Sequence, residues 1–211
     1  MAGAGDQESS RDSWRRLLGG TEASSLVEFA ISLPLLIILV VGIFDFGGAF
    51  NLKQELNNAA REGAHLGATQ PTNDLCPSCT APPSIDAVRY LVDSYLQAAR
   101  LNDCGLSSVL ASSAAFGAQG WEYDASGNGC PGTLKLFIAR DPSTGLSGTP
   151  ICSLAALNYG VNGLTVYLPC TKVAISYPYQ WHFNNVIQLV SPGASYALTN
   201  IATNATVANT N

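Results

Sequence analysis

Cys76 and Cys79, in the stretch CPSC, have the spacing that most resembles a chemical motif in this sequence. Such a pair serves as a redox centre, as half of a zinc site or as part of a disulfide framework. A redox pair needs a helix at the second cysteine, whereas TAPP follows here and a helical pattern begins only after Pro83. Zinc needs a second close pair, but the other cysteines are widely spaced. They are Cys104, Cys130, Cys152 and Cys170. The spacing favours disulfides and leaves the other two readings open.

The remaining polar residues do not form a catalytic motif. The two histidines are His65, within a helical pattern, and His182, within the aromatic stretch YPYQWHF. The sequence has no phosphate-binding loop, nucleophile elbow or metal signature. A net charge of −5 and a pI near 4.8 argue against a nucleic-acid partner, which would require a basic face. We therefore expect a protein that is not an enzyme and that holds no cofactor or metal.

Residues 29–44, FAISLPLLIILVVGIF, form an uncharged apolar run just before Asp45 and just after Glu28. As a helix the run is about 24 Å long, and a few flanking residues extend it to the roughly 30 Å of a bilayer core. The predicted transmembrane segment begins at Phe29 and ends at Phe44. Pro34 lies inside it and removes one backbone hydrogen bond, so either a kink or local melting of the helix is expected there. A carboxylate at each end requires an explanation, because burying it is costly.

The orientation follows from arginine and cysteine placement. Arg11, Arg15 and Arg16 precede the run, which favours a cytoplasmic N-terminus. All six cysteines follow it, which favours an oxidising compartment on the other side. A cleaved secretory signal peptide and a simple signal anchor are the alternatives. A signal peptide fits poorly with the long polar region before the run.

The helical pattern continues past the membrane run to Pro71. Apolar and small residues keep a helical spacing through NLKQELNNAAREGAHLGA, which predicts one helix over residues 26–68, on the order of 60 Å long. Small residues let two helices approach closely. The second half of this helix could therefore pack on another subunit or on its own domain, and both readings stay open.

Residues 24–68, together with the polar leader before them, resemble the TadE family. The pieces that carry the resemblance are, in order, the leader, VEFA, the run ISLPLLIILVVGIFDFG and NNAAREGA. Members of this family are pseudopilins or minor pilins of the tight-adherence (Tad/Flp, type IVb) pilus system. The resemblance implies cleavage by prepilin peptidase between Ala23 and Ser24, although glycine usually precedes the cut. Glu28 is then the fifth residue, and with Phe29 it makes the assembly contact. A cut after Gly20, or none, stays an alternative.

The resemblance also implies partners and a location. The partners are prepilin peptidase, the major Flp-type pilin, a sister pseudopilin and inner-membrane platform proteins. The protein would cross the bacterial inner membrane once, with a periplasmic C-terminal domain, and could enter the extracellular pilus. The expected parts are a cleaved leader at residues 1–23, a transmembrane and extended helix at 24–69, and an outer domain at 70–211.

The outer domain reads as α+β. Ser84 is expected to cap a helix in SIDAVRYLVDSYLQAARLN, with an apolar stripe through Val88 and Val92. The segments WEY and TLKLFIAR predict a hairpin with a glycine-rich turn around Cys130. The stretch GLTVYLPCTKVAISYPY predicts two further strands separated at Pro169. In the tail ASYALTNIATNATV, apolar and polar residues alternate again, which predicts a last strand. We expect an antiparallel sheet with one helix packed on it.

Two questions stay open at this stage. In YPYQWHF, alternate positions place aromatic rings on one strand face, either as sheet core or as a contact surface. These rings are Tyr177, Tyr179, Trp181 and Phe183. The alternative functions are a membrane-anchored or secreted disulfide-rich binding domain, and an oxidoreductase that uses Cys76 and Cys79.

Overall fold

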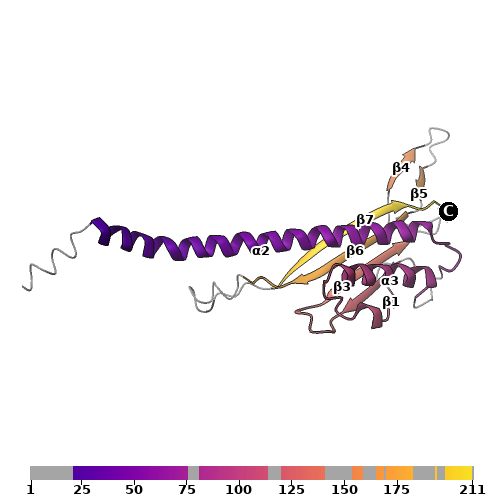
Figure 1. Cartoon of the computed structure of the whole chain (residues 1–211). Helices are drawn as coiled ribbons and strands as arrows, with labels where there is room; N and C mark the ends of the chain where they lie inside the picture. Colours follow the sequence, from indigo (N-terminus) through magenta and orange to yellow (C-terminus); the bar gives the residue numbers. More distant parts are fainter. Residues whose placement is uncertain are drawn as a thin grey trace, which may run out of the picture.

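The structure is a computed structural model that describes residues 21–75, 81–113, 120–140, 154–158, 165–168, 170–182, 193 and 198–210. Its longest element is helix α2 (Thr21–Thr69), which runs past the outer domain and projects far beyond it (Figure 1). The predicted helix over residues 26–68 is confirmed, and it begins five residues earlier than expected. Leader residues 1–20 lie outside the described residues.

Helix α3 (Pro83–Ala98) packs against the second half of α2. The expectation that Ser84 caps it is wrong, because Pro82 occupies the N-cap position and Ser84 is already helical. The Asp74 carboxylate does the capping instead. It accepts hydrogen bonds from the Ser84 backbone N–H at 2.8 Å and from the Ser84 hydroxyl at 3.0 Å. A carboxylate at the positive end of the helix replaces the local cap.

The main sheet is antiparallel, with the strand order β1-β2-β3-β6-β7. Its strands are β1 (Ser112–Ser113), β2 (Gly120–Ala125), β3 (Leu134–Arg140), β6 (Cys170–Tyr179) and β7 (Thr199–Ala208). A separate two-stranded sheet joins β4 (Leu154–Asn158) to β5 (Thr165–Leu168). The predicted hairpin and the final strand are confirmed. β5 ends at Leu168 and β6 begins at Cys170, and Pro169 between them lies outside the described residues. The α+β prediction is confirmed as well.

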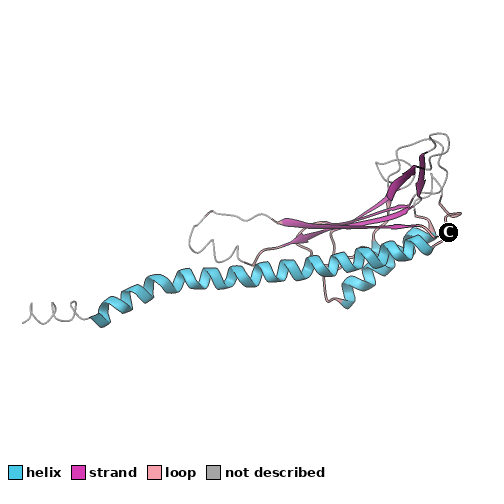
Figure 2. Ribbon diagram, turned by 90° about the horizontal axis from the view of Figure 1, so that it is seen from above, coloured by secondary structure: helices cyan, strands magenta, loops and turns pink. Residues whose placement is uncertain are grey.

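One face of the main sheet is apolar and covered by both helices, as Figure 2 shows. Tyr123 pairs with Leu136 and Leu136 with Ile175 across β2, β3 and β6, and all three side chains are buried. The opposite face carries polar residues such as Lys135, which lies 3.1 Å from Glu122. This alternation is the pattern that antiparallel strands adopt over a core.

The small-residue half of α2 packs on its own domain. Leu56, Ala60 and Ala64 are fully buried beneath α3 and the sheet. The helix approaches most closely at Gly67, where an added Cβ would lie 2.6 Å from Thr171 Cγ2. At Gly63 the same atom would lie 3.1 Å from Val92 Cγ2. Of the two readings left open by the sequence, packing within the chain is the one observed.

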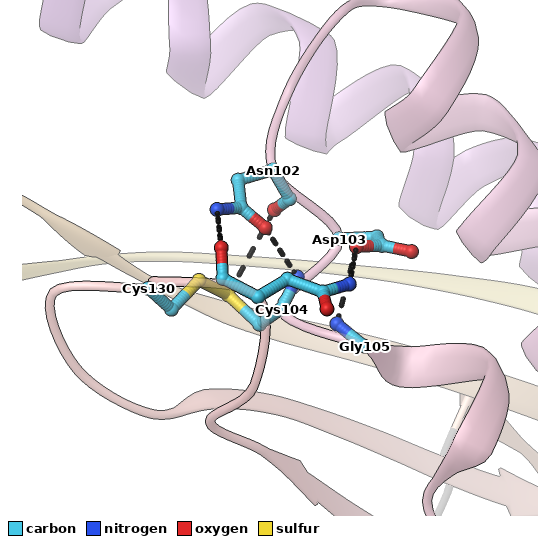
Figure 3. The surroundings of a disulfide bond; sticks show 6 residues. Asn102, Asp103, Cys104, Gly105 and Cys130 are labelled. Carbon is cyan, nitrogen blue, oxygen red and sulfur yellow. Dashed lines mark hydrogen bonds between the residues drawn. A yellow bond between two sulfur atoms is a disulfide. The ribbon is translucent and has the colours of Figure 1, made fainter.

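A disulfide between Cys104 and Cys130 joins the segment after α3 to the β2–β3 turn. Figure 3 shows how side-chain oxygens fix the backbone around it. The Asn102 side chain accepts from the Cys104 N–H at 2.9 Å, and the Asp103 carboxylate accepts from the Gly105 N–H at 3.1 Å. Cys104 has a φ of 54°, which these contacts and the covalent bond together hold in place.

A buried arginine ties the far end of α2 to the sheet. The fully buried Arg140 guanidinium donates to the carbonyls of Gln70 at 2.7 Å and Pro71 at 3.1 Å, just beyond the helix end. A cation at this end complements the helix dipole. Burial lowers the pKa of Arg140. Arg140 also approaches Thr171, whose hydroxyl donates to Asn209 at 2.7 Å. The C-terminus of α2 is therefore held by β3 and β6.

Candidate functional site: the apolar half of helix α2 and its junction with the sheet

The first half of α2 exposes apolar side chains along its length. Phe29 is 62% exposed and Phe44 is 76% exposed, and the leucines and isoleucines between them are also largely uncovered. Within the described residues, α2 is the one helix long and apolar enough to cross a membrane. A soluble domain does not leave so much contiguous apolar surface in water. This half of α2 is compatible with a single-pass membrane anchor.

The residues expected at the processing site lie in the first turns of α2. Ala23 and Ser24 are helical, and Ser24 is exposed. Glu28 is exposed one turn further on. Within the described part of the chain, its carboxylate has no hydrogen-bond or ion-pair partner. Beyond the hydrogen bonds of the helix itself, its backbone carbonyl accepts from the Ser32 hydroxyl at 2.8 Å.

Pro34 does not interrupt the helix. α2 is one continuous element through Pro34. Figure 2 shows that the projecting half of α2 as a whole curves gently. Proline cannot donate to the carbonyl one turn before it. The hydrogen bond from Ser32 to the backbone of Glu28 lies in the same region and is of the kind that bends helices. The local effect is therefore curvature rather than a break.

Asp45, at the other end of the apolar run, is buried against the outer domain. Its side chain is only 2% exposed. The Tyr179 hydroxyl donates to Asp45 Oδ1 at 3.1 Å, and His182 Nδ1 lies 3.2 Å from the same oxygen. Burial, and then the nearby Asp45 carboxylate, raises the pKa of Tyr179, which keeps its hydroxyl protonated as a donor. Asp45 thus fastens the end of β6 to α2.

The sequence did not identify this contact. It placed a carboxylate at each end of the apolar run, but it gave Asp45 no partner. The signal available was general: a carboxylate beside apolar residues requires a donor. The partners of Asp45 are more than 130 positions away, so only the fold brings them together.

The aromatic stretch YPYQWHF begins in β6, and its described rings pack within the chain, so a contact with a partner stays untested. Tyr177 is buried in the sheet core. Further along, the Trp181 ring packs edge-on against Phe46 of α2 at 5.3 Å and against Tyr179 at 5.1 Å. Phe183 lies outside the described residues. The stretch is thus core at its beginning and a helix contact at its end.

The structure bears only partly on the cysteines and histidines. Cys170 is also disulfide-bonded, and none of the described cysteines is free. Cys76, Cys79 and Cys152 lie outside the described residues, so the redox and zinc readings of CPSC stay untested. His65 and His182 are exposed. Among the described residues, no group of three or more potential ligands could hold a metal ion.

One comparison with known proteins gives a match. The model of the TadE-like protein family matches residues 23–65. The matched stretch covers the exposed apolar half of α2 and most of its packed half, and includes Glu28 and Asp45. No curated protein matches the chain, and no solved structure does. The resemblance noted in the sequence is thereby confirmed for this segment, and the outer domain lies beyond it.

Proposed function

We propose that this protein is a TadE-like minor pilin or pseudopilin, a single-pass membrane protein that takes part in assembling Tad/Flp pili for adherence. The family match over residues 23–65 and the exposed apolar helix support a membrane protein of this pilus system. The observation that carries the finer role is Glu28. It is a carboxylate at the start of an apolar helix, and no described residue of its own chain pairs with it.

Glu28 requires a partner that the described part of its own chain does not supply. An unpaired carboxylate is costly at the edge of a bilayer, and a cation offsets that cost. Cleavage between Ala23 and Ser24 by prepilin peptidase would free an α-amino group on each subunit. The amine of one subunit would then pair with Glu28 of its neighbour, with Phe29 beside the contact. Asp45 needs no such partner, because Tyr179 and His182 already contact it.

The orientation follows from charge and redox chemistry. Arg11, Arg15 and Arg16 favour a cytoplasmic N-terminus. The Cys104–Cys130 disulfide favours an oxidising compartment for the outer domain, which is the periplasm for a protein of the inner membrane. The partners would be the major Flp-type pilin, a sister pseudopilin, the inner-membrane platform proteins and the peptidase. In this role the protein is structural and not an enzyme.

The test is replacement of Glu28 in cells that carry the pilus system. We expect Glu28→Ala and Glu28→Gln to reduce surface pili by about tenfold or more, since each removes a charge pair at a site of low dielectric. Glu62→Ala is the matched control, because Glu62 is exposed on the packed half of the same helix. Pili sheared from cells are quantified beside the amount of protein in membranes. Normal piliation with Glu28→Ala would favour an anchored binding domain instead.

A further inference from the structure

An apolar groove of about 330 Å³ lies where α2 meets the end of the sheet. One wall is a single stripe of α2, and the other comes from the segment after β6 and from β7. The lining residues are Phe46, Ala49, Phe50, Lys53, Trp181, Asn200, Ile201 and Ala202. Phe46, Ala49, Phe50 and Lys53 follow the pattern i, i+3, i+4 and i+7, so they share one helix face. The groove is continuous with the exposed apolar surface that precedes it on α2.

The helix places this groove at the membrane surface, an argument that rests on the proposed membrane span. From Leu26 to Phe46 the helix rises about 30 Å, which matches the hydrocarbon core. Phe50 and Lys53 then lie about 6 Å and about 10 Å further out, at the level of the lipid headgroups. Side chains on a helix tilt toward its N-terminus, so Lys53 extends back toward the membrane.

The lining has the composition of a membrane interface. Phe46 is 70% exposed and forms an edge-on pair with Trp181, whose indole N–H donates to the Thr199 hydroxyl at 2.9 Å. An apolar ring with a satisfied polar edge is the arrangement that tryptophan adopts at headgroup depth. Lys53 supplies a cation at the outer rim. Within the described residues it forms no ion pair, so its charge is available to an anion.

We propose that this groove binds a phospholipid of the leaflet that faces the outer domain. The upper part of an acyl chain lies against Phe46, Phe50 and Trp181, and the phosphate pairs with the Lys53 ammonium. A second copy of the chain is the other candidate occupant. Lipid is favoured because the groove adjoins the membrane-facing surface of α2 and pairs an apolar floor with a cation at phosphate depth.

The first test measures the depth of Trp181. Full-length protein carrying Trp14→Phe is inserted into nanodiscs of phosphatidylcholine and phosphatidylglycerol, with a nitroxide on either the headgroup or carbon 5 of the acyl chain. The Trp181 signal is the difference from the same protein carrying Trp181→Phe as well. We expect either label to reduce this signal by about twofold or more, as for interfacial tryptophan. Trp121, buried in the sheet, is the internal control and should be unaffected.

The second test measures how much Lys53 contributes to the binding of an anionic phospholipid. Native mass spectrometry counts phosphatidylglycerol bound to the detergent-solubilised protein. We expect Lys53→Gln to weaken this binding by about fivefold, the equivalent of about 1 kcal/mol for one lysine near an anionic surface. Lys172→Gln is the matched control, because Lys172 lies on β6 seven residues before Tyr179, on the order of 23 Å away along the strand. Equal binding by the two variants would overturn the phosphate contact.

The outcomes separate this inference from the proposed function. Protein that inserts into nanodiscs but shows no quenching of Trp181 would place the groove in water, and the lipid inference would be wrong while the anchor stands. If Trp181 were protected from the nitroxide only in nanodiscs that hold two copies of the protein, the groove would bind a second chain. That result would also overturn the lipid inference. Failure of the full-length protein to insert would overturn both.

Discussion

At the scale of single residues, the two carboxylates that bracket the apolar run of α2 have opposite surroundings. Asp45 is buried and contacts Tyr179 and His182, whereas Glu28 is exposed and pairs with no described residue. Both would be costly in a bilayer without a partner. Asp45 therefore has a role within the molecule, and the exposed, unpaired Glu28 is the residue for which we propose a contact between molecules.

The junction at Asp45 predicts an energetic coupling between α2 and β6. We expect Tyr179→Phe to lower the free energy of unfolding by about 1.5–3 kcal/mol, the usual worth of a hydrogen bond to a charged group. Asp45→Asn and the variant with both substitutions complete a double-mutant cycle. In it, the loss of stability in the double variant should differ from the sum of the losses in the two single variants. Thermal unfolding in detergent gives the values. Additive effects would show that the two side chains do not interact.

A buried tyrosine predicts how stability changes at alkaline pH. Burial, and then the charge of Asp86, raises the pKa of Tyr123 above its ordinary value near 10. The unfolded chain therefore loses this proton first, so the stabilisation is complete below about pH 10 and falls as the pH rises beyond it. Tyr123→Phe should be less stable than wild type at pH 7, where it lacks the hydrogen bond to Asp86, which is 3.3 Å long.

At pH 11 the difference in the free energy of unfolding between wild type and Tyr123→Phe should become smaller or change sign. Phenylalanine has no proton to lose, so the variant escapes the alkaline loss. Denaturant unfolding at both pH values measures the difference. A stability gap between Tyr123→Phe and wild type that stays constant from pH 7 to pH 11 would contradict this account of Tyr123.

At the scale of elements, the two halves of the single helix α2 differ in what they expose and bury. Its first half exposes large apolar side chains, and its second half buries small ones such as Ala60 and Ala64. Gly67 sets the closest approach to the sheet. The neighbouring Thr171 side chain is buried, and its hydroxyl is held by Asn209, so it cannot move aside easily.

This packing predicts different effects for two glycines of the same helix. Gly67→Ala should lower the free energy of unfolding by about 1–3 kcal/mol through overpacking against Thr171. Gly47→Ala is the matched control, because nothing lies within 4 Å of the added Cβ. Since alanine favours helix, Gly47→Ala should leave stability unchanged or raise it by up to about 1 kcal/mol. Equal thermal shifts for both would contradict the close approach at Gly67.

The elements were largely predictable from sequence, and their contacts were not. Helix and strand periods in the chain predicted α2, α3 and the alternating strands. The cap of α3 was mispredicted because Ser84 has the local chemistry of a cap, while the actual acceptor, Asp74, is ten residues away. Likewise, nothing local marks Arg140 as the buried cation at the end of α2. Long-range polar contacts depend on the fold, whereas periodicity is a property of each segment.

At the scale of the whole molecule, the outer domain packs along the C-terminal half of helix α2. The sheet and α3 pack on the C-terminal part of α2, and the apolar part projects free of them (Figure 1). The polar contacts that fasten the domain to α2 include those at Asp45, at Asn57, which Thr203 contacts, and at the helix end held by Arg140. The domain is therefore fixed to the helix, so that a pull or a rotation of the helix would carry the domain with it.

The central claim, that the chain is processed and assembled as a pilin, is tested most directly by the N-terminal sequence of the mature protein recovered from membranes. We predict a chain that starts at Ser24, which makes Glu28 the fifth residue and exposes an amine for the neighbouring subunit. A chain that still starts at or near Met1 would be an uncleaved anchor. A chain that starts near Phe50 would be a secreted domain without its apolar helix. Either of these results would contradict the account.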